Sequence, residues 1–215
     1  MATWIGALVE TRDHAELAAL LAEHHIEMVG PPAPWILVHC DAGLSHLHLP
    51  DFAEALSLKL DASVIGFLVQ TTGGVEQIEH WQAGKLVRKL DYSGDAGGWV
   101  TQAGMPQAWE RAYFFADDES TAEDGTWPTN LGDELTDDER ARYECARAAQ
   151  DASGIMDLLV GASVWPLQRL CRHFGVDPRQ PAAQNFPRKS WKPRVVLAAV
   201  AVFLAGMLLL GMRSR

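Results

Sequence analysis

Hydrophobic and polar positions alternate along the first part of the chain with two different periods. Residues 3–10 and 35–40 are apolar runs of strand length, and the second run reads WILVHC. Between them, residues 13–24 carry leucines at helical spacing, with Asp13 in the N-cap position. Apolar residues return at helical spacing over residues 51–60, which predicts a second helix.

The next part of the chain predicts an antiparallel meander. Its three strands cover residues 64–70, 75–81 and 85–92. Short turns that contain glycine join them, as is typical of hairpins. The element order (strand, helix, strand, helix, three strands) predicts an α+β fold, an α/β sandwich with an antiparallel meander.

Helices are predicted to dominate the chain after the meander. Residues 94–106 are rich in glycine and are expected to be irregular, while residues 109–115 are expected to add an edge element. Short helices are predicted over residues 137–150, 155–160 and 166–174, the first of them capped by Thr136. The predicted organisation is an α/β domain (1–116), an acidic linker (117–135), a helical segment (136–178), a basic juxtamembrane linker (179–193) and a transmembrane helix (194–212).

The hydrophobic pattern changes most strongly near the C-terminus. Residues 195–212 read VVLAAVAVFLAGMLLLGM, 18 residues without a charge. As a helix, this run spans about 27 Å, close to the hydrocarbon thickness of a bilayer. A buried core helix is the alternative, although such a helix usually keeps a polar stripe. The run therefore predicts a single-pass membrane anchor with the lipid bilayer as a partner.

Basic residues flank this run unequally and predict its orientation. Four precede it closely, whereas two follow it: Arg188, Lys189, Lys192 and Arg194 against Arg213 and Arg215. The positive-inside rule then places the N-terminal part in the cytoplasm. Trp191 lies where an interfacial aromatic would anchor the helix, and the N-terminus lacks a secretory signal pattern.

Charge and cysteine content narrow the classes of partner. The formal net charge is −10, and eleven acidic residues lie between Glu110 and Glu139, where Arg111 is the one basic residue. Such a stretch repels phosphate backbones, so nucleic acid is not an expected partner. It is either a solvated linker or a surface for a basic protein. Three widely spaced cysteines without a CxxC pattern predict no disulfide framework, which agrees with the cytoplasm.

The sharpest candidate for catalysis follows the WILV run. Residues 39–46 read HCDAGLSH and resemble the HCxxGxxR phosphate-binding loop of protein tyrosine phosphatases. The resemblance implies Cys40 as the nucleophile, with His39 and His46 as its neighbours in the site. His46 stands where the family has arginine, and an imidazole cannot provide the bidentate clamp. The alternative is that Cys40 is a small buried apolar residue at a strand end.

Histidines near this loop raise the question of a metal site. His46 and His48 are two residues apart and would share a face of a strand, with Asp41 or Asp51 as a third ligand. Scattered histidines near a loop are the simpler interpretation. We therefore predict no metal site and no cofactor.

Tryptophans gather in the half that holds the meander. Trp81, Trp99 and Trp109, with Arg88, are either core residues or a binding surface for a partner or a stacked ligand. The patterns W-x-x-G-x-L-V-R and P-x-x-W-E resemble an uncharacterised bacterial α/β domain family. The positions that carry this resemblance are Trp81, Gly84, Leu86, Val87, Arg88, Pro106, Trp109 and Glu110. The resemblance implies a fold module over residues 1–116 and no activity.

The sequence thus favours a tail-anchored protein whose cytoplasmic domain binds a protein partner or forms a scaffold at the membrane, with homo-oligomers as one possibility. A membrane-attached, phosphatase-like hydrolase that uses Cys40 is the second hypothesis. A small-ligand sensor, with its pocket between the sheet and the tryptophan-rich segment, is the third. No complete catalytic set is visible in the sequence, so an enzyme is the less favoured class.

Overall fold

The computed structural model describes residues 3–11, 13–22, 27–29, 34–40, 49–115, 131 and 135–178, without the side chains of residues 22, 27–29, 40 and 49–51. The chain divides into two compact units, Met1–Ala183 and Gln184–Arg215, and every described residue lies in the first. The predicted acidic linker lies largely outside the described residues, and the predicted membrane helix lies entirely outside them. Within the described part, no helix is long and apolar enough to cross a membrane.

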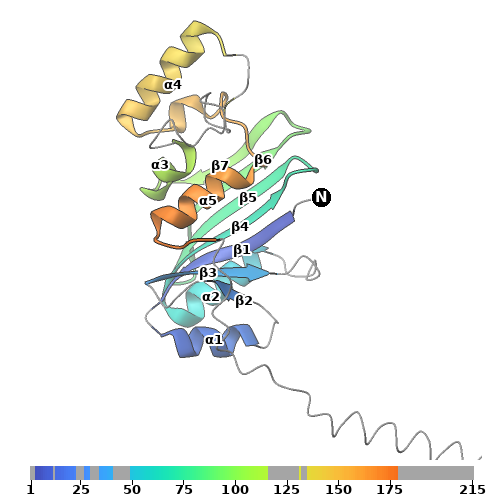
Figure 1. Cartoon of the computed structure of the whole chain (residues 1–215), viewed down its shortest axis with the longest axis vertical. Helices are drawn as coiled ribbons and strands as arrows, with labels where there is room; N and C mark the ends of the chain where they lie inside the picture. The colour runs from blue at the N-terminus through green and yellow to red at the C-terminus, as the bar shows by residue number, and fades with distance from the viewer. Residues whose placement is uncertain are drawn as a thin grey trace, which may run out of the picture. The chain divides into compact units, whose positions relative to one another are not determined.

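The described part is an α+β unit built on a seven-stranded antiparallel sheet, which confirms the predicted class (Figure 1). The strand order is β2-β3-β1-β4-β5-β6-β7. The strands are β1 (Thr3–Glu10), β2 (Glu27–Val29), β3 (Trp35–Cys40), β4 (Ser63–Gln70), β5 (Val75–Gln82), β6 (Lys85–Ser93) and β7 (Gly98–Gly104). The helices are α1 (His14–Ala22), α2 (Leu49–Leu60), α3 (Trp109–Phe114), α4 (Asp137–Ala149), the 3-10 turn η2 (Ser153–Ile155) and α5 (Val164–His173).

Both faces of the central strands are buried, because alternate residues of a strand point to opposite faces. Ile5, Ala7 and Val9 of β1 pack with the apolar faces of α1 and α2. Leu8 of the same strand belongs to the core on the other face, together with residues of α3, α4 and α5. Near-continuous apolar strands such as β1 and β4 are what a sheet covered on both faces requires.

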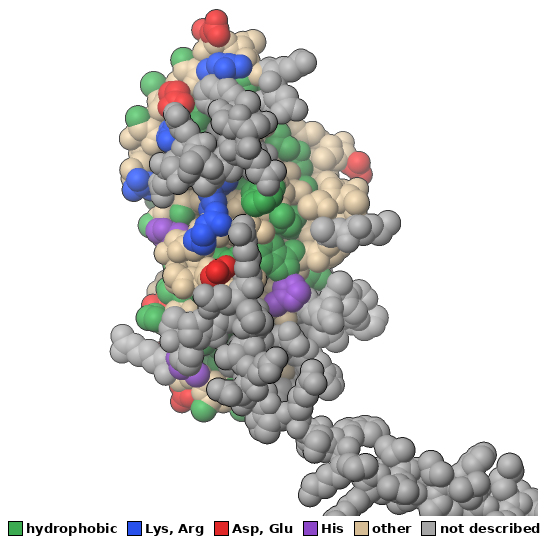
Figure 2. Space-filling view, in the orientation of Figure 1, with side chains coloured by type: hydrophobic (Ala, Val, Ile, Leu, Met, Phe, Trp, Pro, Cys, Tyr) green, Lys and Arg blue, Asp and Glu red, His purple; other side chains and the backbone are tan. Residues whose placement is uncertain are grey.

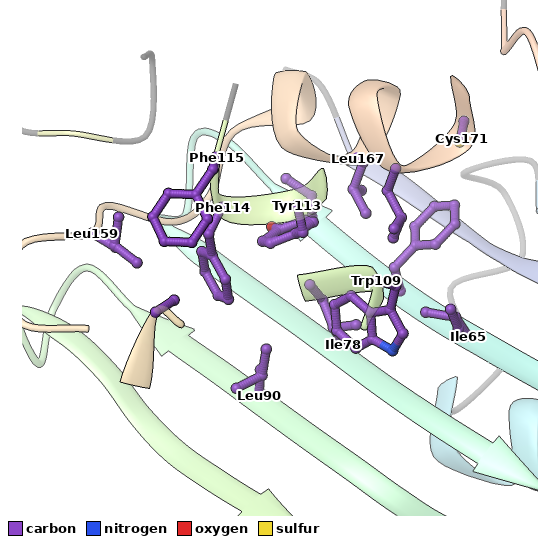
Figure 3. Packing of buried hydrophobic residues seen from close by; sticks show 14 of the residues in the cluster. Ile65, Ile78, Leu90, Trp109, Tyr113, Phe114, Phe115, Leu159, Leu167 and Cys171 are labelled. Atoms are coloured by element: carbon purple, nitrogen blue, oxygen red, sulfur yellow. The ribbon is translucent and has the colours of Figure 1, made fainter. Parts of the chain in front are cut away.

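The core between the sheet, α3 and α5 is built from large side chains. In Figure 3, Tyr113 and Phe114 of α3 lie between α5 and the sheet residues Ile78 and Leu90. Leu167 and Cys171 of α5 are fully buried in the same cluster. The helical segment after residue 135 therefore shares one hydrophobic core with the meander. In the view of Figure 2, hydrophobic side chains gather in the middle of this face and basic ones lie mainly over the helices.

Most predicted elements are confirmed, with four exceptions along the chain. Residues 94–106 are not irregular throughout, because β7 pairs with β6 over much of this stretch. Residues 109–115 are not an edge element, because α3 is a buried helix. Strand β2 was not predicted. Residues 155–160 do not form a helix; they continue from η2 into turns and the isolated bridge between Leu159 and Leu131.

Candidate functional site: a buried polar cluster beneath helix α3

Helix α3 is unusual in that polar contacts attach it to the sheet. It has six residues, WERAYF, and its N-cap residue Ala108 provides no side-chain cap. Isolated helices of this length are not stable in water, so the attachment to the sheet must hold it. Three of its side chains, Trp109, Glu110 and Tyr113, each reach a polar group on β5 or β6.

The first contact joins Trp109 to His80 of β5. The indole N–H of Trp109, which is 4% exposed, donates to Nδ1 of His80 over 3.3 Å. On the other side of the ring, Nε2 of His80 lies 2.7 Å from Oγ of Ser63. Burial lowers the pKa of His80 to about 4, so the ring is neutral at pH 7.

The second contact is a buried ion pair between Glu110 and Arg88 of β6. Nε and Nη2 of Arg88 each donate to one carboxylate oxygen of Glu110 over 2.9 Å. Nη1 of Arg88 donates to the carbonyl of Gly104 over 3.0 Å, and the amide of Gln107 donates to Glu110 over 2.6 Å. The two side chains are only 4% and 7% exposed. The bidentate geometry and the backbone partners satisfy both charges in a place that water does not reach.

The third contact joins Tyr113 to Glu76 of β5. The phenol of Tyr113 and the amide of Ala162 bind the two carboxyl oxygens of Glu76, the amide over 2.7 Å. Burial raises the pKa of Glu76 to about 8, while the hydrogen bond from Ala162 opposes this rise. Glu76 is therefore protonated at pH 7 and links α3, β5 and the segment before α5.

A second polar group lies on the opposite face of β5 and β6. Glu79 is 2% exposed and accepts hydrogen bonds from Nζ of Lys89 and from the indole of Trp81, at 2.9 and 3.0 Å. Lys89 also lies 3.5 Å from Asp91. These contacts raise the pKa of Lys89, chiefly through the hydrogen bond from its ammonium group to Glu79. The lysine thus stays charged and neutralises two carboxylates on this face.

Ser63 and His80 are as close as the two members of a catalytic dyad, but the hydrogen bond between them runs in the wrong direction. A serine nucleophile needs a histidine nitrogen that accepts its proton. An indole N–H can only donate, so Nδ1 of His80 is the acceptor towards Trp109 and Nε2 carries the proton. His80 therefore donates to Ser63 and cannot take its proton. This cluster positions α3 and does not form a nucleophile.

A cavity of about 870 Å³ lies where β1 and β5 end and where β4 and α1 begin. Ser63 lines it, together with Glu10, Asp13, Glu16 and Asp61, which give it a strongly acidic wall. The third sequence hypothesis placed a pocket between the sheet and the tryptophan-rich segment. That space is filled by side chains, since Trp109 is in the core and Trp99 packs against it.

The structure separates the predicted binding residues. Arg88 is buried beneath α3 and Trp109 is a buried residue of α3 itself, whereas Trp81 packs with the core on the opposite face. Trp99 is half-buried, and its indole donates to the carbonyl of Leu159 over 3.1 Å. The role of Arg88 and Glu110 as partners follows only from the fold, because 22 positions separate them. Glu76 and His80 were not predicted from the sequence, and the signal that could have revealed them is their place beside Ile78 on one face of β5.

The predicted catalytic residues are described only in part. His39 lies in β3, and its ring centroid is 6.4 Å from that of Trp4. The backbone of Cys40 pairs with Ile5 at the end of β3. The side chain of Cys40 lies outside what the structure describes, as do His46, His48, Trp191, Lys192, Arg194 and Arg213. Among the described side chains, no group of three or more potential ligands is placed to hold a metal ion.

Comparison of the chain with known protein families, with curated proteins and with solved structures gives no match. A functional conclusion therefore rests on the sequence and structure of this chain itself.

Proposed function

We propose that this chain is a single-pass membrane protein whose α+β unit binds a protein partner at the cytoplasmic face. The observation that carries the proposal is the uncharged apolar run at residues 195–212 with its excess of basic residues on the N-terminal side. The finer architecture that follows is an α/β unit with an antiparallel meander, a helical segment and one C-terminal transmembrane helix.

The described unit supports a binding function more than a catalytic one. Its buried Arg and Glu side chains make contacts within the unit: Arg88 with Glu110, Glu79 with Lys89, and Glu76 with Tyr113. A domain that an anchor holds at the membrane needs only modest affinity for a partner in the same membrane, because anchoring raises the local concentration of both proteins.

Membrane fractionation of the full chain tests the anchor. The native chain should stay with membranes after an alkaline carbonate wash, and Leu204→Arg should move it to the soluble fraction. Leu58→Arg, an exposed position on α2, is the matched control and should leave the distribution unchanged. A native chain that appears in the soluble fraction would rule out the anchor.

Labelling of Cys145 tests the orientation. This thiol is exposed in the structure, so a membrane-impermeant maleimide should react with it only after the cells are opened. Cys145→Ser measures the contribution of the other cysteines. Labelling of Cys145 in intact cells would place the unit outside the cytoplasm and refute the proposed orientation.

Paired affinity purification tests the binding function itself. The full chain in mild detergent and residues 1–187 serve as the two baits. Recovery of the same specific partner by both supports binding by the folded unit, and recovery of none by either argues against a scaffold.

A hydrolase that uses Cys40 is the second proposal, and one observation favours it. Strand β3 ends at Cys40, and the nucleophile of a phosphate-binding loop directly follows a buried strand. Loss of phosphatase activity in Cys40→Ser with the fold intact would support this function. A native chain without activity on aryl phosphates would refute it.

A further inference from the structure

Helix α5 has a buried side and an exposed side that differ in composition. Trp165, Arg169 and Arg172 follow one another at intervals of four and three residues, so they lie along one side of the helix. Trp165 is 38% exposed, and Arg172 is exposed as well. Arg169 lies between them and donates to the carbonyl of Tyr113 over 2.7 Å. The opposite side of the helix is buried and consists of Pro166, Leu167, Leu170 and Cys171.

The charge of the chain changes sign shortly before this helix. Residues 1–157 contain twenty-seven acidic residues and nine basic ones, whereas residues 158–194 contain one acidic residue and seven basic ones. The acidic residue is Asp177, which follows the helix, so α5 itself has no acidic side chain. On the neighbouring helix α3, Arg111 is exposed while Glu110 is buried. The exposed charges of α3 and α5 are therefore all positive, in a chain whose net charge is −10.

An anchor at residues 195–212 would hold α5 near a bilayer. Sixteen residues separate Pro178 from Val195, and fully extended they span at most about 55 Å. The cytoplasmic leaflet is negatively charged, so it attracts basic residues and repels the acidic part of the chain. Tryptophan is common at the level of the lipid headgroups, because its ring is apolar and its N–H is polar. The arginine and the tryptophan on the exposed side of α5 thus both suit a lipid surface.

We propose that the exposed side of α5 binds anionic lipid headgroups, with Arg172 as the charged contact and Trp165 at the level of the headgroups. The inference rests on the proposed anchor and adds an orientation to it: the folded unit lies on the membrane with α5 towards the lipid. The acidic remainder of the chain turns away, since an anionic leaflet repels it. This orientation leaves α1 and α2, which cover the opposite face of the sheet, accessible to a protein partner.

Quenching of tryptophan fluorescence by brominated lipid tests the contact. The full chain is placed in nanodiscs of phosphatidylcholine brominated near the headgroup, with and without phosphatidylglycerol. The difference between the native chain and Trp165→Phe isolates the signal of Trp165 from that of the other tryptophans. Trp165 should be quenched in the discs that contain phosphatidylglycerol and much less in the discs that do not.

Charge variants test the role of Arg172. Arg172→Glu should lower the equilibrium constant of the contact at least about fivefold, the effect of removing one basic residue from an anionic surface, whereas Arg172→Lys should keep the contact. Lys59→Glu is the matched control, because it makes the same change of charge at an exposed position of α2, on the other face of the sheet. Three results would each overturn the inference: no quenching of Trp165, equal quenching with and without phosphatidylglycerol, or quenching that Arg172→Glu leaves unchanged.

Failure of this inference is distinguishable from failure of the anchor. A native chain that stays with membranes after the carbonate wash, but whose Trp165 is not quenched, refutes only the lipid contact. If the native chain is soluble, the same lipids are supplied as vesicles. Quenching of Trp165 by these vesicles then leaves the lipid contact standing without the anchor, and its absence refutes both. A protein partner that Arg172→Glu loses, in a chain whose Trp165 is not quenched, would assign this side of α5 to an acidic protein instead.

Discussion

The buried ion pair between Arg88 and Glu110 offers the sharpest test of the fold. Replacing Glu110 by Gln leaves the guanidinium of Arg88 charged, only 4% exposed and without its counter-charge. Breaking a buried pair in this way costs roughly 3–5 kcal/mol, because the remaining charge has lost its compensation in a place without water. Arg88→Met should cost a similar amount, since it leaves the Glu110 carboxylate unpaired.

The double variant Arg88→Met/Glu110→Leu should behave differently from either single variant. With both charges removed, no unpaired charge is left. The free energy of unfolding should therefore fall by much less than the sum of its decreases in the two single variants. The difference between that sum and the measured loss is the coupling energy of the pair.

Arg142 and Asp157 supply a matched control on the surface. They also form a bidentate pair, at 2.8 and 3.1 Å, but their side chains are 46% and 62% exposed. Arg142→Met should therefore lower the free energy of unfolding far less than Glu110→Gln does.

The assay is urea unfolding of the full chain in a non-ionic detergent, followed by tryptophan fluorescence. Equal losses for Glu110→Gln and Arg142→Met, or additive losses in the double variant, would show that burial does not set the energy of this pair.

Three further predictions concern the same region. The folded state keeps the proton of Glu76 up to about pH 8, whereas the unfolded chain releases it above 4.5, so stability should fall as pH rises across this window. The depressed pKa of His80 makes the free energy of unfolding rise with pH below pH 6.5, so the two effects oppose each other there. Between pH 6.5 and 8 only the effect of Glu76 is left, and the free energy of unfolding should fall by roughly 2 kcal/mol. Glu76→Gln should abolish that fall in thermal melts, and an unchanged slope would contradict the assignment. Nitrogen chemical shifts should show His80 neutral with its proton on Nε2, and a proton on Nδ1 would restore the Ser63 pair as a candidate dyad. Gly161→Ala should destabilise the unit by about 1–3 kcal/mol, because its Cβ would lie 2.5 Å from the ring of Tyr92, whereas Gly154→Ala meets no atom within 4 Å and should be neutral.

The sequence predicted the regular elements best where local signals and burial agreed. Helix α4 is an example, since Thr136 and Glu139 form the capping box at which it begins. The strands of the meander also followed from their alternation and from the glycine turns between them.

The errors came from elements whose stability depends on the rest of the fold. Strand β7 contains glycine at both ends, which lowers its intrinsic strand preference, and it forms because β6 provides a partner. Helix α3 is rich in aromatic residues and too short to show a period, and its conformation is fixed by contacts with β5 and β6. No local pattern encodes such contacts.

The candidate site was also predicted only in part. The sequence drew attention to Arg88, Trp109 and Glu110 as parts of a motif, but it did not show that the last two lie on a helix that packs over Arg88. The sequence offered them as a possible binding surface, whereas in the structure they attach α3 to the sheet within the core. The contact between Arg88 and Glu110 depends on three-dimensional proximity, which the sequence does not show.

The dependence of α3 on the sheet also predicts an order of folding. Partners of the three contacts lie 22 to 37 positions apart in the sequence. A helix of six residues is not stable in isolation. We therefore expect it to form only after β5 and β6 have paired and present Glu76, His80 and Arg88. During that interval these three side chains are in water with their ordinary charges. The docking of α3 is then a late kinetic step that takes up a proton at Glu76, and its rate should depend on pH even where the rate of hairpin formation does not.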